Sequence, residues 1–162
     1  MLTVKQLVAN TNSHRSNVVK NSSDVTIAFG KTREGKDPRG YYKAVVGRAL
    51  SRGRNKRQKK FEIRLYYPMT RAKADQYIPP ALRKGLYTGP EKAPPFTIQS
   101  KVWVSCDCEY FLYHCEVADA EHDSASIKYS NGKYPTQTNP QGVGHICKHL
   151  LASVRKGALL KK

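Results

Sequence analysis

Two short stretches decide the fold of this sequence: Val102-Trp-Val-Ser-Cys-Asp-Cys108 and His145-Ile-Cys-Lys-His-Leu-Leu-Ala152. In the first, alternating apolar residues predict a strand that runs directly into a Cys-x-Cys pair. The second places a Cys-x-His pair at the start of a predicted helix. Side chains two residues apart at a strand end or in a first helical turn can converge on one ion. The two pairs therefore predict a site that joins two distant pieces of the chain.

Three thiols and one imidazole are ligands that zinc prefers, and it binds four of them as a tetrahedron. The predicted ligands are Cys106, Cys108, Cys147 and His149. Four protein ligands fill the coordination shell and leave no position for a reactive water, so we expect a structural zinc. A disulfide between Cys106 and Cys108 is disfavoured because cysteines this close rarely reach a relaxed geometry. The alternative is a pair of core thiols beside an incidental histidine.

Other residues near the two stretches have simpler interpretations. Cys115 is expected to be a small buried thiol, with a fifth or substitute metal ligand as the alternative. The remaining histidines of this region are expected at the surface or next to the ligands: His114, His122 and His145. Trp103 alternates with its neighbours and is expected in the core, or covering the metal site or a partner.

The order strand, Cys-x-Cys, helix and Cys-x-His at a helix start resembles the SWIM-type zinc finger, over residues 98–155. The 38 residues between Cys108 and Cys147 are more than a compact SWIM finger has. The stretches 129–132, 138–140 and 147–150 are similar to SWIM-like proteins of tailed bacteriophages. The family resemblance implies binding to DNA or protein without catalysis. Residues 1–95 resemble no family that we can name.

The remaining sequence predicts a mixture of helices and strands. Thr3 and Gln6 form a capping-box pattern for a helix that ends near Asn10. Alternating apolar residues predict an antiparallel meander of three strands, at 24–30, 41–50 and 61–67. The Ser/Asn-rich stretch 11–23 and the Gly/Pro-containing stretch 31–40 are expected to be loops.

In the second half, residues 71–78 predict a short helix, and 79–95, with five prolines, predict a connector. A strand is expected at 96–104 and a helix at 109–121. A hairpin with a type I′ turn at Asn131-Gly132 is expected at 125–135. The last helix is expected at 145–155. The predicted class is α+β, with a basic N-terminal region at 1–95 and a zinc-stapled SWIM-like module at 96–162.

Charge is the dominant feature of the composition. The 162 residues include 29 Lys and Arg against 12 Asp and Glu, a net charge of +17, and residues 1–60 carry fifteen of these basic residues and three acidic ones. Such an excess favours polyanions, and acidic protein surfaces satisfy it equally. No apolar run approaches the ~20 residues of a membrane span, and no secretory signal pattern opens the sequence. Four cysteines without such a signal favour a reducing compartment.

A basic loop is predicted between the second and third strands, at 51–60. Its cations are Arg52, Arg54, Lys56, Arg57, Lys59 and Lys60. Charge runs usually face water, so a solvated hairpin tip is one interpretation. The other is a contact with phosphate or an acidic partner.

The sequence lacks the motifs of common enzymes: a phosphate-binding Gly-rich loop, a nucleophile elbow, an HExxH pair and a dinucleotide fingerprint. We therefore expect a non-enzymatic, zinc-stabilised structural protein. The phage resemblance implies a virion component of the tail, baseplate or neck, assembled in the host cytoplasm and bound to other virion proteins or copies of itself. The alternative is a soluble, cytoplasmic protein that binds nucleic acid, largely without sequence specificity, through the zinc module and the basic loop. Neither interpretation involves a membrane or a small-molecule substrate.

Overall fold

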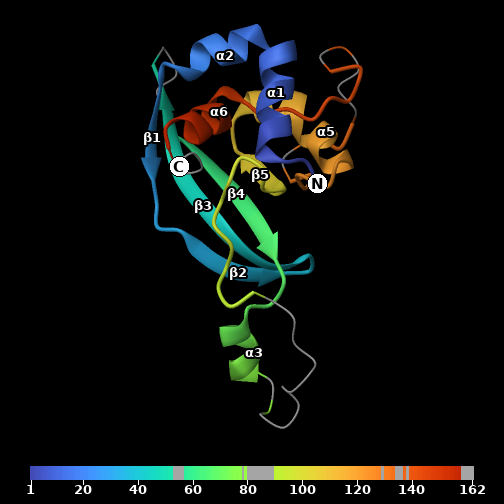
Figure 1. Cartoon of the computed structure of the whole chain (residues 1–162). Coiled ribbons are helices and arrows are strands. Elements are labelled where there is room, and N and C mark those ends of the chain that lie inside the picture. The colour runs from blue at the N-terminus through green and yellow to red at the C-terminus, as the bar shows by residue number, and fades with distance from the viewer. Residues whose placement is uncertain are drawn as a thin grey trace.

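The structure is a computed structural model, and it describes residues 1–52, 57–77, 79, 90–128, 130–133, 137 and 139–157. It has the predicted α+β class, with helices packed on one antiparallel sheet (Figure 1). Among the described residues, no helix is long and apolar enough to cross a membrane.

The sheet has the order β1-β3-β4-β5, with β2 also paired to β3, and every pair is antiparallel. Its strands are β1 (Val25–Phe29), β2 (Arg33–Asp37), β3 (Gly40–Ser51), β4 (Lys59–Tyr67) and β5 (Val102–Cys106). The three strands of the expected meander are present as β1, β3 and β4. β5 extends the same sheet from β4, so the sheet includes strands from both halves of the sequence.

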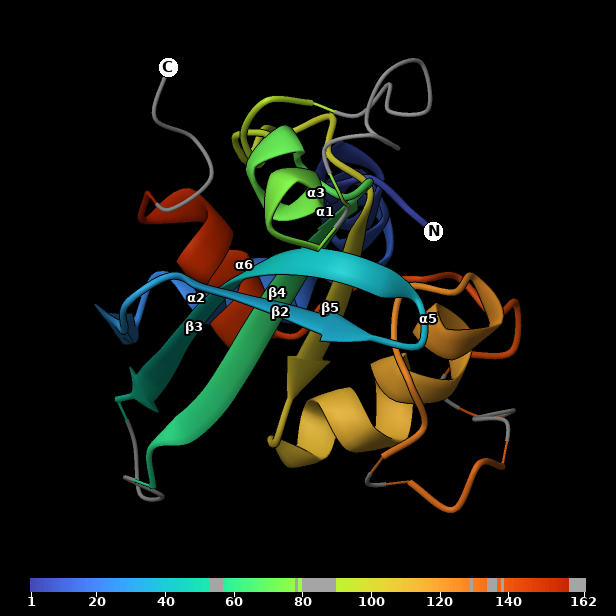
Figure 2. The same cartoon turned by 90° about the horizontal axis from the view of Figure 1, so that it is seen from below.

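The expected loop at 31–40 is wrong, because β2 lies within it. The Gly and Pro residues that suggested a loop make a tight turn instead: Gly40 has φ +127, and the Arg39 backbone N–H donates to Asp37 Oδ1 at 2.8 Å. β2 runs along the first half of the long strand β3, as Figure 2 shows from below.

The helices near the N-terminus are longer than expected. α1 (Val4–His14) begins with the predicted capping box between Thr3 and Gln6, but it continues past Asn10, and α2 (Ser16–Ser22) follows directly. The expected loop at 11–23 is therefore wrong. The polar Thr11 is compatible with a buried helix because its hydroxyl donates to the Leu7 carbonyl oxygen at 2.7 Å.

After β4 comes α3 (Arg71–Tyr77). After β5 come η1 (Phe111–Cys115, a π-helical turn), α5 (Glu116–Glu121) and α6 (Lys148–Arg155). The expected strand at 96–104 begins only at Val102. Within 125–135, the described residues form no strand, and the Asn131-Gly132 hairpin is wrong there. The Lys128 and Ser130 backbone N–H groups instead donate to the buried Glu116 carboxylate, at 3.1 and 2.7 Å.

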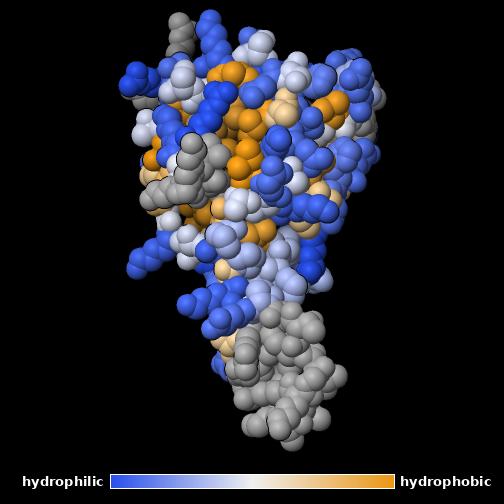
Figure 3. Space-filling view, viewed as in Figure 1, coloured by the Kyte–Doolittle hydropathy of each residue, from blue (hydrophilic) through white to orange (hydrophobic). Residues whose placement is uncertain are grey.

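The core lies between the sheet and α1, α2 and α6. α6 contacts β1, β3, β4 and β5, and the buried apolar cluster takes residues from both termini, such as Leu7, Ile63 and Leu150. Figure 3 shows the molecular surface in the same view as Figure 1. Apolar side chains gather in the middle of this face, among hydrophilic ones. The division into 1–95 and 96–162 stays a prediction, and the sheet runs across that boundary.

Candidate metal centre

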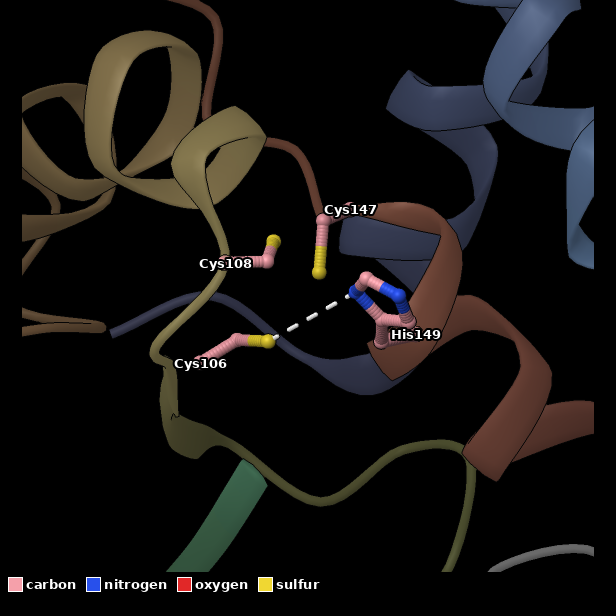
Figure 4. A group of neighbouring side chains, drawn as sticks. All are labelled: Cys106, Cys108, Cys147 and His149. Atoms are coloured by element: carbon pink, nitrogen blue, oxygen red, sulfur yellow. Dashed lines mark hydrogen bonds between the residues drawn. The ribbon is translucent and has the colours of Figure 1, made fainter. Parts of the chain in front are cut away.

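The four predicted ligands meet at one point (Figure 4). Their ligand atoms all lie within 4.8 Å of one another, and all four side chains are buried. Cys106 and Cys108 come from the end of β5 and the segment after it, and Cys147 and His149 come from the start of α6. The site therefore joins the sheet to the last helix.

β5 places the first pair. Cys106 is its last residue and lies opposite Phe61 of β4. Beyond the strand, Asp107 exchanges two hydrogen bonds with the backbone of Lys60: its N–H donates to the Lys60 carbonyl at 3.1 Å, and its carboxylate accepts the Lys60 N–H at 2.8 Å. Cys108 then begins the next helical segment, and its sulfur accepts the Phe111 backbone N–H at 3.3 Å. An N–H directed at sulfur favours the thiolate form.

The start of α6 places the second pair. Cys147 is the N-cap residue, with extended backbone, and its carbonyl accepts the Leu151 N–H at 2.9 Å. His149 lies in the first turn with Nδ1 at 3.8 Å from Cys106 Sγ. Its other ring nitrogen, Nε2, is 2.9 Å from the hydroxyl of Ser51, the last residue of β3. A second contact of this kind fixes the orientation of a ligating imidazole.

The three thiols influence one another strongly. Hydrogen bonding with Cys108 raises the pKa of Cys106, and the same contact lowers the pKa of Cys108. Burial raises the pKa of Cys147. One thiolate is thus stabilised at the expense of its neighbours, and a bound cation is what would allow all three to ionise together.

The geometry fits a tetrahedral metal ion. Zinc–sulfur bonds of about 2.3 Å require ligand atoms separated by about 3.8 Å, the length of a tetrahedron's edge. For a sulfur and a nitrogen the same geometry gives about 3.5 Å, close to the 3.8 Å between Cys106 Sγ and His149 Nδ1, and all ligand atoms fall within 4.8 Å. The cluster can therefore hold a metal ion.

Polar residues of α1 hold the segment that leads to Cys147. The Thr11 hydroxyl accepts the Ile146 backbone N–H at 3.0 Å, and Asn10 donates to the Gly144 carbonyl at 2.7 Å. The buried Asn139 braces the same segment through hydrogen bonds with the Val143 backbone. Sequence reasoning missed these residues and Ser51, since their partners are distant in the sequence or part of an irregular loop.

The other cysteine, the histidines and the tryptophan near the metal centre differ in burial and in their contacts. Cys115 is buried, as expected, and is not part of the four-ligand cluster. Of the three histidines expected at the surface or next to the ligands, His122 is exposed, and His114 is half-buried and stacked on Tyr110. His145, two residues before Cys147 in the sequence, is fully buried, with Nδ1 2.9 Å from the Val143 carbonyl oxygen. Trp103 is buried, and the Arg64 guanidinium lies 4.4 Å from its ring centroid.

The basic loop is described in part. Arg52, Arg57 and Lys60 are exposed and Lys59 is half-buried, while Arg54 and Lys56 lie outside the described residues. Both described ends of this loop are attached to the metal centre: Ser51 contacts His149, and Lys60 contacts Asp107.

Comparison with known protein families, with characterised proteins and with solved structures finds no match to this chain. The buried Cys3His cluster is consistent with a zinc finger. The SWIM-type assignment and the relationship to phage proteins rest on the sequence resemblance.

Proposed function

We propose that the cluster holds a structural zinc ion and that the chain is a non-enzymatic protein of the SWIM-like type. The observation that carries this proposal is the convergence of three thiols and one imidazole, all buried, within 4.8 Å of one another. This donor set suits zinc better than magnesium or calcium, which prefer oxygen. With all four positions filled by protein, the ion has no site for a substrate.

Zinc would contribute to folding by fastening β5 to α6. The ligand pairs lie 38 residues apart in the sequence, and the segment between them includes irregular loops. Binding free energy at such a site becomes folding free energy, because the unfolded chain does not hold the ligands together.

Ligand substitutions test this proposal against a matched control. Cys106→Ser and His149→Ala should each lose zinc and lower the melting temperature. Cys115→Ala removes a buried thiol outside the cluster and should keep one zinc per chain. Zinc content by mass spectrometry of the metal, with melting followed by circular dichroism, distinguishes them. Full zinc content in both ligand variants would contradict the ligand assignment.

We further propose that the protein acts as a tailed-phage virion component, at the tail, baseplate or neck, through contacts with other virion proteins or copies of itself. The support is the similarity of 129–132, 138–140 and 147–150 to SWIM-like phage proteins. Quantitative mass spectrometry of purified particles should find the chain at a fixed small-integer ratio to a known structural protein. Absence from particles would overturn this role.

The second candidate function is nucleic-acid binding in the cytoplasm. It is favoured by the net charge of +17 and by the exposed cations next to the metal centre. A variant with all six cations of the basic loop changed to Ser separates the candidates. Lost DNA affinity with intact assembly supports nucleic-acid binding, and failed assembly with intact affinity supports the virion role.

A further inference from the structure

A basic groove lies on the face of the sheet turned away from α6. Along β4, Phe61 and Ile63 are buried in the core, while Lys60 and Glu62 point to the opposite, open face. A groove of about 530 Å³ is hollowed there. Its twelve lining residues come from β1, β2, β3, β4, β5 and the loops beside them, and four are basic: Arg33, Arg48, Lys60 and Lys128.

The groove has one acidic side chain, and that side chain is already paired. Glu62 accepts hydrogen bonds from Arg64 at 2.8 Å and from Arg33 at 3.3 Å. Burial opposes ionisation of Glu62, but its interactions with Arg64 and Arg33 together outweigh this effect and lower its pKa. The carboxylate therefore stays charged and engaged with two arginines.

Arg48 and Lys60 lie directly opposite each other across β3 and β4. Like charges in this position destabilise an antiparallel pair, because the side chains leave the sheet about 5 Å apart. Within the part of the chain that the structure describes, neither forms an ion pair, and Arg48 has only the neutral Gln58 amide at 3.5 Å. A bound anion between them would remove this repulsion.

The metal-binding segments contact both of the strands that carry this pair of cations. Lys60 is held through its backbone to Asp107, which stands between two ligands. The strand that carries Arg48 ends at Ser51, whose hydroxyl contacts the ligand His149. The β3–β4 pairing places Arg48 opposite Lys60, and the contacts of the metal-binding segments hold the ends of these two strands.

We propose that this groove binds the phosphodiester backbone of a nucleic acid across Arg48 and Lys60, and that the metal ion positions the two cations for it. The proposal of a metal-linked groove rests on the zinc site proposed above. A guanidinium offers paired donors that match phosphate oxygens, and an ammonium supplies a second charge. Arg52 and Arg57, the other exposed cations described within the basic loop, lie at the same end of the sheet and would meet neighbouring phosphates.

An acidic protein partner fits the groove less well. Protein interfaces obtain most of their binding energy from buried aromatic or aliphatic anchors. Among the lining residues the one large exposed apolar side chain is Phe29, which lies on a strand at the groove's edge. The other apolar lining side chains with exposed surface, Ala28 and Val46, are small and offer no such anchor.

The test compares two variants with the same change in net charge. Arg48→Ser/Lys60→Ser removes the groove cations, and Lys5→Ser/Lys20→Ser removes two exposed cations from α1 and α2. Fluorescence anisotropy with labelled 20-nucleotide single-stranded and duplex DNA, in zinc-loaded protein, measures affinity across a salt series. We expect the groove variant to bind at least about tenfold more weakly than the control variant, with a salt slope reduced by about two. Equal binding by the two variants would overturn the proposal.

A second experiment tests whether the metal ion positions Arg48 and Lys60 for DNA binding. Removing zinc with a chelator should weaken DNA binding by the wild type toward the level of the groove variant, and should change the groove variant little. Unchanged wild-type affinity after verified zinc loss would overturn the positioning role. Polyglutamate serves as a competitor, added so that its concentration of negative charges equals that of the DNA. If polyglutamate then displaces the DNA, the groove favours an acidic protein, and the nucleic-acid site is contradicted. Zinc content is measured in the same samples. Purified wild type without zinc would contradict the metal centre itself, whereas wild type with zinc but without the expected DNA binding would contradict only the groove.

Discussion

The Ser51 hydroxyl lies 2.9 Å from His149 Nε2, although the two residues are 98 positions apart in the sequence. This contact brings the end of β3, and with it the basic loop, against a ligand of the metal centre. It also leaves Nδ1, which faces Cys106, free of that hydrogen bond. The imidazole can therefore bind the ion through Nδ1 while Nε2–H donates to Ser51.

Ser51→Ala should weaken zinc binding without removing a ligand. Loss of a hydrogen bond that orients a ligating histidine typically costs about 10- to 100-fold in metal affinity. Competition with a chromophoric chelator measures the effect. Ser23→Ala is the control, because among the described residues the Ser23 hydroxyl bonds only the Lys20 carbonyl, on an exposed turn. Equal affinities in the two variants would show that Ser51 does not support the ligand.

Thr11→Val should destabilise the segment before Cys147. The Thr11 hydroxyl accepts the Ile146 N–H in the protein interior, and valine has the same shape but no acceptor. Leaving a buried donor unpaired costs about 1–3 kcal/mol in free energy of unfolding. Hydrogen exchange should quicken at the Ile146 amide in Thr11→Val and remain slow in Thr11→Ser, which keeps the hydroxyl. Equal protection in both variants would contradict the role of this bond.

Asp119→Asn should alter the pH dependence of stability. Asp119 is fully buried, and among the described residues its carboxylate oxygens have no hydrogen-bond partner, so burial raises its pKa well above the ordinary value. An acid with a raised pKa in the folded state contributes its stability at low pH and loses it as pH rises through that pKa. The free energy of unfolding of the wild type should therefore fall relative to Asp119→Asn as pH increases above about 4. Urea titrations of both proteins at several pH values measure this. A difference in free energy of unfolding that does not change with pH would contradict the prediction.

Arg64→Lys should destabilise the open face of the sheet while leaving zinc bound. The Arg64 guanidinium lies 4.4 Å from the ring centroids of both Tyr42 and Trp103, and it forms ion pairs with Asp37 at 2.9 Å and Glu62 at 2.8 Å. Lysine keeps the charge but loses the planar fork that makes these contacts together, so we expect a loss of about 1–2 kcal/mol in urea unfolding. Arg33→Lys is the control, since Arg33 is more exposed and, in the part of the chain that the structure describes, has one ion pair, with Glu62. A larger loss in the control would contradict this assignment.

The metal ligands could be predicted from the sequence because each pair is local: Cys106 with Cys108, and Cys147 with His149. The capping box at Thr3 and the alternating strand at β4 were predictable for the same reason. The contacts that position the site were not, because Ser51 and Thr11 reach partners that only the folded chain brings near. β2 was missed since Pro38 and Gly40, typical of loops, also make a tight turn between two strands.

The most direct test of the metal centre is zinc X-ray absorption spectroscopy on the purified chain, with zinc stoichiometry measured on the same sample. The proposed zinc site predicts one zinc per chain with three sulfur ligands at about 2.3 Å and one nitrogen at about 2.0 Å. Stoichiometry well below one, or a shell dominated by nitrogen and oxygen, would contradict the Cys106, Cys108, Cys147 and His149 site.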